Sequence, residues 1–145
     1  MPLHLVKLCV GAESFDDLRR WMADRVAEAK RRGEPPRHAH VTRMTPKRVA
    51  EILDGGSLYW VIKGWIAARQ RILDIEPFLD ADGVGRCRLW LDSEVVAVLP
   101  RPMRPFQGWR YFDEKSAPPD LAAAGRGAID MPETLRRELS QLGLL

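Results

Sequence analysis

The chain has 145 residues, of which 46% are hydrophobic and 30% are charged, and its 23 basic and 20 acidic side chains give a net charge of +3. These values are typical of one folded soluble domain and indicate only a mild preference for anionic partners. No apolar run approaches the roughly 20 residues that a membrane-spanning helix needs, and the N-terminal stretch lacks the basic region of a signal peptide. Because the chain has only two cysteines, a disulfide framework is not expected and a cytoplasmic setting is favoured.

A strand and a long helix are expected first. Residues 3–10 form an apolar run that ends at Gly11, which predicts a buried strand. A helix is expected over residues 14–32, because Ser14 is a typical N-cap and Asp17 complements the helix dipole. Apolar residues follow at helical spacing, so one face of this helix should pack on a sheet.

A second strand and a second helix follow. Residues 37–44 alternate between side chains of different character, which predicts a short strand. Thr45 is then expected to cap a helix that has Pro46 at its first position. That helix should end at Gly55 and Gly56, which permit a tight turn with positive φ.

From Ser57 the pattern has a period of two, which predicts a strand with two distinct faces. Gly64 interrupts it and predicts a bulge or a bend that divides one long strand into two or curves the sheet. The alternation puts three side chains on each face: Leu58, Trp60 and Ile62 on one, and Tyr59, Val61 and Lys63 on the other.

Several further short strands complete the expected sheet. The pair Asp82-Gly83 predicts a hairpin turn, and residues 86–91, 94–99 and 109–112 have the composition of strands. The fold class predicted is therefore α+β, with a curved or barrel-like, mostly antiparallel β-sheet flanked by two or three helices.

The domain organisation follows from composition. Residues 1–115 are predicted to form a single α+β domain, and residues 116–145 a C-terminal appendage that is rich in Pro, Ala and Gly and contains a short helix. Leu135, Leu139 and Leu142 form a narrow apolar stripe on that helix, which would suit a weak dimer or a protein partner.

His38 and His40 are the weak candidates for catalysis. Two imidazoles on one face of a strand can chelate a metal, but no third ligand stands at a suitable spacing. No metal site and no cofactor are therefore predicted. Either histidine could act as a general base, although no nucleophile is visibly paired with it.

Aromatic residues interleaved with basic ones give the stronger functional signal. Residues 55–75 and 100–112 both combine rings, which can stack on a base, with arginine or lysine, which can hold a phosphate. Alternation must bury about half of the rings, so the same pattern also fits a core with a charged surface. The predicted ligand-binding residues are Tyr59, Trp60, Lys63, Trp65, Arg69, Arg71, Arg104, Gln107, Trp109 and Arg110.

Two resemblances bear on this hypothesis. Residues 3–11, 40–48, 55–64, 69–72 and 104–111 resemble the DUF1489 family, a domain of unknown function found in short alphaproteobacterial proteins. That family has no assigned activity, so the resemblance implies none. The order of elements is also similar, more weakly, to the PUA-like superfamily with its ASCH and EVE domains. This second resemblance implies a small β-barrel that binds RNA or modified bases.

The function predicted is binding of RNA, a modified nucleobase or a nucleotide-like ligand by a PUA-like sheet, through aromatic stacking and contacts of Arg and Lys with anions. One alternative is a small enzyme that acts on an anionic substrate, with His38 or His40 as base and Arg110 as anion clamp. The other is a protein-interaction module that uses the C-terminal helix.

Overall fold

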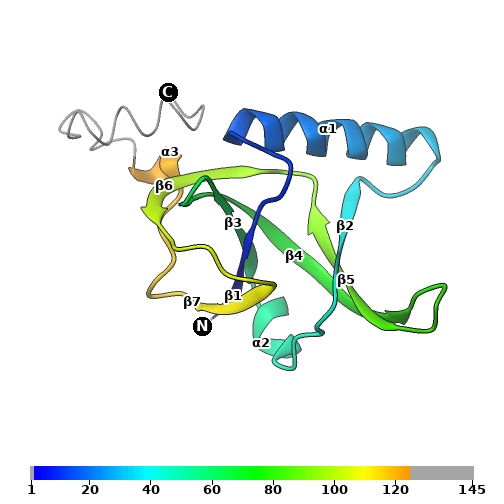
Figure 1. Ribbon diagram of the computed structural model, residues 1–145. Coiled ribbons are helices and arrows are strands. Elements are labelled where there is room, and N and C mark those ends of the chain that lie inside the picture. The colour runs from blue at the N-terminus through cyan, green and yellow to red at the C-terminus, as the bar shows by residue number, and fades with distance from the viewer. Residues whose placement is uncertain (1, 125–145) are drawn as a thin grey trace.

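The structure is a computed structural model that describes residues 2–124. Strands and helices follow one another along most of this range (Figure 1). Their order is β1 (Leu3–Leu8), α1 (Phe15–Arg31), β2 (Arg37–Thr42), α2 (Val49–Leu53), β3 (Ser57–Ile62), β4 (Trp65–Leu79), β5 (Gly85–Asp92), β6 (Val96–Pro102), β7 (Trp109–Asp113) and α3 (Leu121–Ala124).

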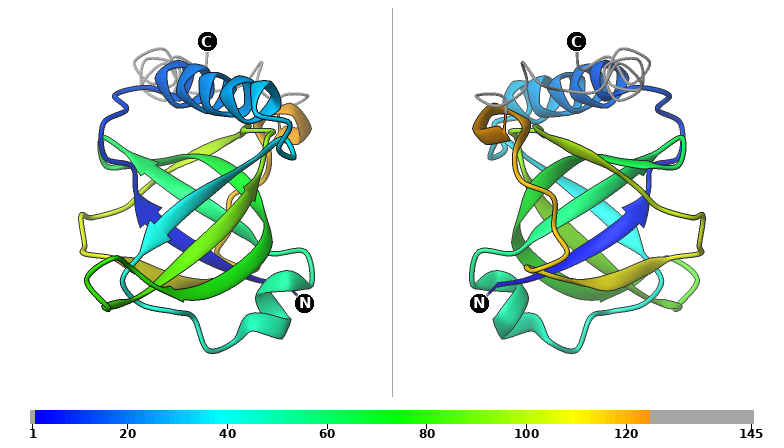
Figure 2. Two further views of the ribbon diagram at one scale, coloured as in Figure 1. Left: turned by 90° about the vertical axis from the view of Figure 1, so that its right-hand side faces the viewer. Right: turned by 90° about the vertical axis from the view of Figure 1, so that its left-hand side faces the viewer.

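The seven strands form one strongly curved sheet in the order β2-β5-β4-β3-β1-β7, with β6 paired to β4 (Figure 2). All pairs are antiparallel except β1 with β3, in which Leu5 lies opposite Leu58. The first part of β4 pairs with β3 and β6, and its second part pairs with β5, with a register shift between Ile72 and Asp74. Bulges of this kind bend a strand. The predicted curved, mostly antiparallel α+β sheet is confirmed.

The sheet is not a closed barrel. In the described part of the chain, β2 and β7 are the two ends of the strand order and do not pair with each other. We call this break in strand pairing between β2 and β7 the seam. Along the seam, the edge strands β2 and β7 have backbone N–H and C=O groups that are not paired with another strand, and side chains can bond to these groups.

Two apolar cores lie on opposite faces of the sheet. The larger core fills the inside of the curve and includes Trp60 of β3, Leu89 of β5, Leu18 and Met22 of α1, and Ile52 of α2. Helix α1 lies across one open end of the curve and α2 near the other (Figure 1). A smaller core covers the outer face of the sheet and consists of Val6, Tyr59, Val61, Ile66, Val98, Phe106 and Phe112. The predicted division of faces along 58–62 is thus confirmed.

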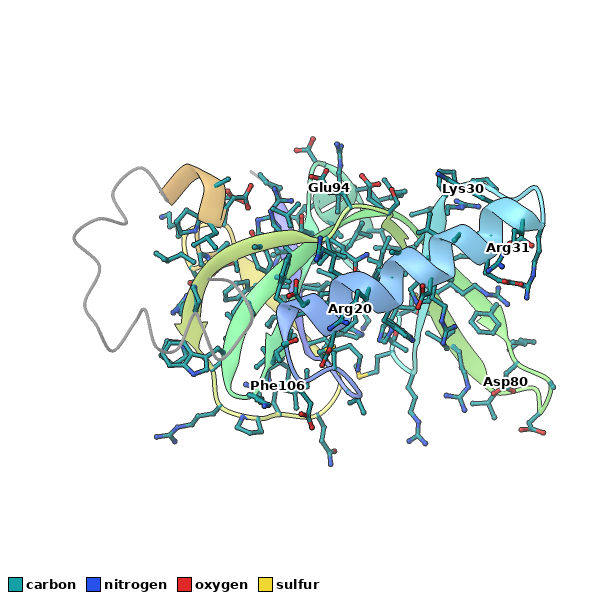
Figure 3. The ribbon with its side chains drawn as sticks, turned by 90° about the horizontal axis from the view of Figure 1, so that it is seen from above. Arg20, Lys30, Arg31, Asp80, Glu94 and Phe106 are labelled. Carbon is teal, nitrogen blue, oxygen red and sulfur yellow. The ribbon has the colours of Figure 1, made fainter. Side chains whose placement is uncertain are left out.

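Helix α1 begins and ends as its sequence predicts. Ser14 is the N-cap, and its hydroxyl accepts a hydrogen bond from the Asp17 backbone N–H at 3.1 Å. The outer side of the helix carries charged side chains, among them Arg20, Lys30 and Arg31 (Figure 3). The helix therefore packs its apolar stripe on the sheet and exposes its other face to solvent.

Helix α2 begins later than the sequence predicts. It starts at Val49, and the expected cap Thr45 lies outside it. The segment before it makes a long-range contact instead, in which the Tyr111 hydroxyl accepts hydrogen bonds from the backbone N–H groups of Lys47 and Arg48, at 2.9 and 3.4 Å. A side chain of β7 thus accepts hydrogen bonds from two backbone N–H groups, which would have no intrahelical partner in the first turn of a longer helix.

The β3–β4 connection is a two-residue hairpin turn formed by Lys63 and Gly64, both with positive φ, at 50° and 82°. Positive φ at both central residues is typical of a type I′ turn. Of the two outcomes expected from Gly64, the division of one long strand into two is the one observed. Curvature comes instead from register shifts elsewhere, such as the one between Trp60 and Val61.

The residues just beyond position 115 run along β6. Val98 forms an isolated bridge with Asp120, and the Leu99 N–H donates to the Pro119 carbonyl at 2.8 Å. The predicted C-terminal helix with Leu135 lies outside the described residues. No helix within residues 2–124 is long and apolar enough to cross a membrane.

Candidate functional site

Two of the predicted stacking residues lie in the apolar cores. Trp60 is only 2% exposed, and its indole N–H donates to the Gln70 side-chain oxygen at 2.9 Å. Gln70 in turn donates to the Asp92 backbone oxygen at 2.9 Å, so this buried polar group is satisfied. Tyr59 is 4% exposed and packs edge-on against Phe112. In this conformation the ring of Trp60 cannot stack on a ligand.

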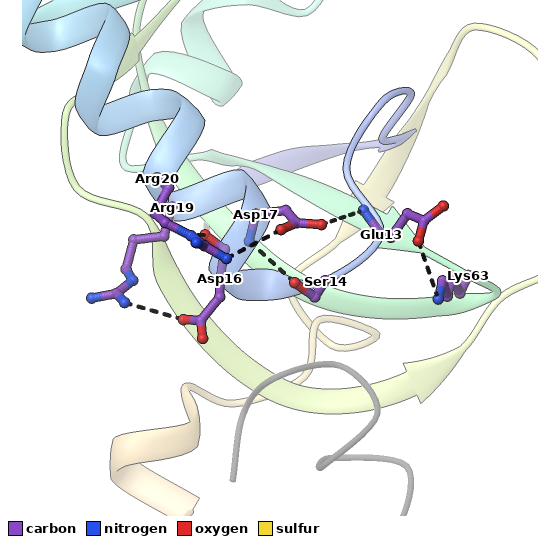
Figure 4. A network of polar contacts seen from close by, with 7 residues as sticks. All are labelled: Glu13, Ser14, Asp16, Asp17, Arg19, Arg20 and Lys63. Atoms are coloured by element: carbon purple, nitrogen blue, oxygen red, sulfur yellow. Dashed lines mark hydrogen bonds and ion pairs between the residues drawn. The ribbon is translucent and has the colours of Figure 1, made fainter.

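Lys63 and Trp65 lie at the β3–β4 turn. The Lys63 ammonium is 3.9 Å from the carboxylate of Glu13, in the segment that leads into α1 (Figure 4). Trp65 is partly buried against the larger core. The Gly64 carbonyl accepts a hydrogen bond from the Met103 N–H at 2.9 Å, so this turn adjoins the start of the 103–108 connection. The two aromatic and basic segments of the sequence are therefore neighbours.

Three predicted arginines lie on the surface. Arg71, Arg104 and Arg110 are exposed, and the Arg110 guanidinium stands 4.6 Å from the centre of the Phe106 ring. Arginine over an aromatic face is a favourable packing of a cation and needs no ligand. None of the three lines a cavity described below.

A cavity of about 670 Å³ lies at the seam. We call it the seam cavity. Strands β1, β2, β5 and β7 and the loops beside them contribute its walls: Lys7, Val41, Thr42, Arg43, Met44, Arg86, Gln107, Gly108 and Trp109. Gln107 and Trp109 are thus the predicted ligand-binding residues that this cavity brings together.

Side chains of β7 bridge the seam. The Trp109 indole N–H donates to the Met44 carbonyl at 2.8 Å, and the Tyr111 hydroxyl accepts from the loop after β2, as described above. The rings of Trp109 and Tyr111 pack edge to face, with centroids 5.0 Å apart. These contacts fix the partly exposed Trp109 ring at the wall of the cavity.

The seam cavity is positively charged. Lys7, Arg43 and Arg86 line it, and no carboxylate is among its lining residues. Arg86 is paired with Asp80 at 2.6 Å, whereas Arg43 is exposed. Burial lowers the pKa of Lys7 from its ordinary value. An anion that neutralises Lys7 and Arg43 would offset this desolvation.

Sequence reasoning missed Lys7 and Arg43. Lys7 is the single charged residue in the apolar run over 3–10, and an ionisable side chain in such a run is a signal that could have been used. Arg43 follows a strand by one residue and carries no comparable local signal.

A second cavity, of about 420 Å³, lies on the outer face of the sheet. We call it the outer cavity. The sheet and the 114–120 segment line it: Pro2, His4, Gly55, Ser57, Tyr59, Arg69, Glu114, Ala117, Pro118, Pro119 and Asp120. Tyr59 and Arg69 of the predicted set lie here, so the predicted residues divide between two cavities.

Arg69 is an ion-pair residue in the outer cavity. Its Nε and Nη2 donate to the two carboxylate oxygens of Asp120 at 2.7 and 2.8 Å, and its Nη1 donates to the Ser57 hydroxyl at 3.1 Å. The hydrogen bond to Arg69 lowers the pKa of Asp120, and the same bond raises the pKa of Arg69. Three of its five N–H donors are thus engaged and Asp120 neutralises its charge, so Arg69 attracts an added anion only weakly.

His38 and His40 point to the inner face of the sheet. The His38 ring packs on Trp21 and the His40 ring on Trp60, with centroids 5.3 and 5.0 Å apart. Burial, followed by the charges of Lys7 and His38, lowers the pKa of His40 to about 4. Neither histidine lines the seam cavity or the outer cavity. Within residues 2–124 no three His, Cys, Asp or Glu side chains gather as metal ligands would.

Similarity to known proteins covers nearly the whole chain. The family described as "Protein of unknown function (DUF1489)" matches residues 5–145. The chain therefore belongs to the DUF1489 family. No curated protein and no solved structure matches it. The resemblance to the PUA-like superfamily is not shown by these comparisons.

Proposed function

We propose that this protein binds single-stranded RNA, or a ligand that contains a nucleobase and a phosphate, in the seam cavity. The observation that carries the proposal is the composition of that cavity. A fixed, partly exposed tryptophan and an exposed glutamine lie among three basic side chains, of which Arg86 is paired with Asp80, and no carboxylate lines the cavity. A base stacks on an aromatic ring, an amide reads its edge, and lysine and arginine hold phosphate.

The proposal keeps Gln107, Trp109 and Arg104 from the predicted set and adds Lys7 and Arg43. Trp109 supplies the stacking surface and Gln107 the directional hydrogen bonds, while Lys7 and Arg43 supply the positive charge. Arg104 lies on the same 103–108 connection as Gln107 and is exposed, so it extends the basic surface at the entrance. A PUA-like ancestry would fit this use of a curved sheet and is part of the proposal.

Binding of fluorescent single-stranded RNA should weaken as salt rises. Each phosphate contacted contributes about 0.7 to the slope of log affinity against log salt, so two or three contacts give a slope of about −1.5 to −2. Trp109→Leu should raise Kd about tenfold or more, because stacking on one ring is worth about 1–3 kcal/mol. Arg43→Gln should reduce the slope by about 0.7. Fluorescence anisotropy over a salt series measures both quantities.

Two controls make the test specific to the seam cavity. Arg19→Gln removes the same charge from the exposed face of α1, and Arg71→Gln removes it from a predicted site residue outside the cavity. Both should bind RNA as the unmodified chain does. The proposal fails if RNA binding is absent or insensitive to salt, or if Arg71→Gln weakens it as much as Arg43→Gln.

A further inference from the structure

The outer cavity has the opposite charge from the seam cavity. Its ionised side chains are Arg69, Asp120 and Glu114. Asp120 and Arg69 neutralise each other through two short hydrogen bonds, which leaves the Glu114 carboxylate as the net charge of the cavity. Glu114 keeps 46% of its side chain exposed, so a ligand can reach it.

His4 does not compensate this charge. The Ser57 backbone N–H donates to His4 Nδ1 at 2.9 Å, so Nδ1 must carry a lone pair and the ring proton must reside on Nε2. His4 Nε2 then donates to Glu114. The imidazole is therefore neutral in this arrangement, and it orients Glu114 without cancelling its charge.

Tyr59 adds a buried polar group that faces the same space. Its side chain is 4% exposed and is among the residues that line the cavity. Arg69, Glu114 and Asp120 line the same cavity as Tyr59. Burial raises the pKa of Tyr59 to about 12, so the hydroxyl stays neutral and can accept a hydrogen bond from a ligand.

We propose that the outer cavity binds a small organic cation, namely a primary ammonium group on a short aliphatic chain. The ammonium lies between the Glu114 carboxylate and the Tyr59 hydroxyl, and the aliphatic chain packs on the apolar walls formed by Pro2, Pro118 and Pro119. An anion is disfavoured because Asp120 already neutralises the Arg69 guanidinium and Glu114 would repel the anion. The proposal is independent of RNA binding at the seam.

The test uses the full chain labelled with ¹⁵N and three ligands of similar shape: n-butylammonium, 1-butanol and butyrate. In amide NMR spectra, n-butylammonium should shift the signals of residues 55–57 and 114–120, with a Kd on the order of a millimolar, since so few atoms make little contact. The neutral alcohol should bind about fivefold more weakly or less, and butyrate should cause no shifts there. Higher salt should weaken the ammonium complex.

Two variants and a control locate the binding. Glu114→Gln should weaken n-butylammonium binding about threefold or more, as expected for loss of a partly exposed ion pair. Tyr59→Phe should also weaken it, through loss of the hydroxyl alone. Glu13→Gln removes the same charge from an exposed loop outside the cavity and should leave the Kd unchanged. The proposal is overturned if none of the ligands shifts these signals, if the alcohol binds as well as the amine, or if Glu114→Gln behaves like Glu13→Gln. Each outcome is independent of the RNA assay.

Discussion

Replacing Gly56 with alanine should destabilise the protein by about 4 kcal/mol or more, because the added methyl group has no room. A Cβ at this position would lie 2.2 Å from the Leu3 carbonyl oxygen and 2.4 Å from the Ile52 carbonyl oxygen. Both are backbone atoms, so relief requires β1 or α2 to move. The Gly56 N–H also donates to Ile52 at 2.7 Å, and its carbonyl accepts from Ile72 at 3.0 Å, which ties the position to α2 and β4.

Gly55→Ala is the matched control for this prediction. Gly55 has a positive φ of 96°, but its Cβ would meet only the Pro2 side chain, at 3.8 Å. The cost should be limited to the left-handed backbone, about 1–2 kcal/mol. Urea unfolding followed by circular dichroism gives both free energies. Equal losses for the two variants would contradict the predicted close approach at Gly56.

The second large effect is the pH dependence of stability that His40 should cause. Its pKa falls from an ordinary value of 6.5 to about 4 in the folded protein. The folded state therefore binds the proton less readily than the unfolded state does. The stabilisation is fully present above pH 6.5 and is lost as the pH falls toward 4. Between pH 7 and 4.5 the loss from this group should be about 2 kcal/mol.

His40→Phe should remove that part of the pH dependence while keeping a ring beside Trp60. The His40 Nε2 atom is buried and has no hydrogen-bond partner within residues 2–124, so the substitution breaks no hydrogen bond there. Comparing unfolding free energies at pH 7 and 4.5 within each variant cancels any packing change. His38→Phe should have a smaller effect, because His38 packs on the exposed Trp21. If His40→Phe loses as much stability on acidification as the unmodified chain, the lowered pKa is wrong.

Local sequence patterns predicted the strand faces well. Alternation over 58–62 put Trp60 and Tyr59 on opposite faces, because a period of two is a direct consequence of strand geometry. It did not show that both faces are covered by apolar cores, in which the structure buries the two rings. The Ser14 cap of α1 was predictable for the same reason, since donor and acceptor lie three residues apart. The start of α2 was not, and the segment before it contacts Tyr111, which lies far along the chain and which no local pattern indicates.

The sequence predicted the types of residue in the candidate site but not which residues lie together there. Residues 55–75 and 100–112 do adjoin, through the pairing of β4 with β6. The curvature of the sheet, however, turns Arg69 toward the 114–120 segment, where Asp120 pairs with it, and leaves Trp109 at the seam. The twist and curvature of the whole sheet decide which residues lie opposite each other across the seam. No single stretch of sequence encodes that curvature.

The account depends most on the claim that RNA enters the seam cavity, and the tryptophan indole N–H signals test it most directly. The chain has five tryptophans, so each indole can be followed in the ¹⁵N spectrum of the full-length protein during titration with single-stranded RNA. We predict that the Trp109 signal shifts or broadens, since this ring lines the cavity, and that the Trp60 signal does not change, since its indole is bound to Gln70 in the core. A titration in which RNA binds while the Trp109 signal stays unchanged would contradict the account.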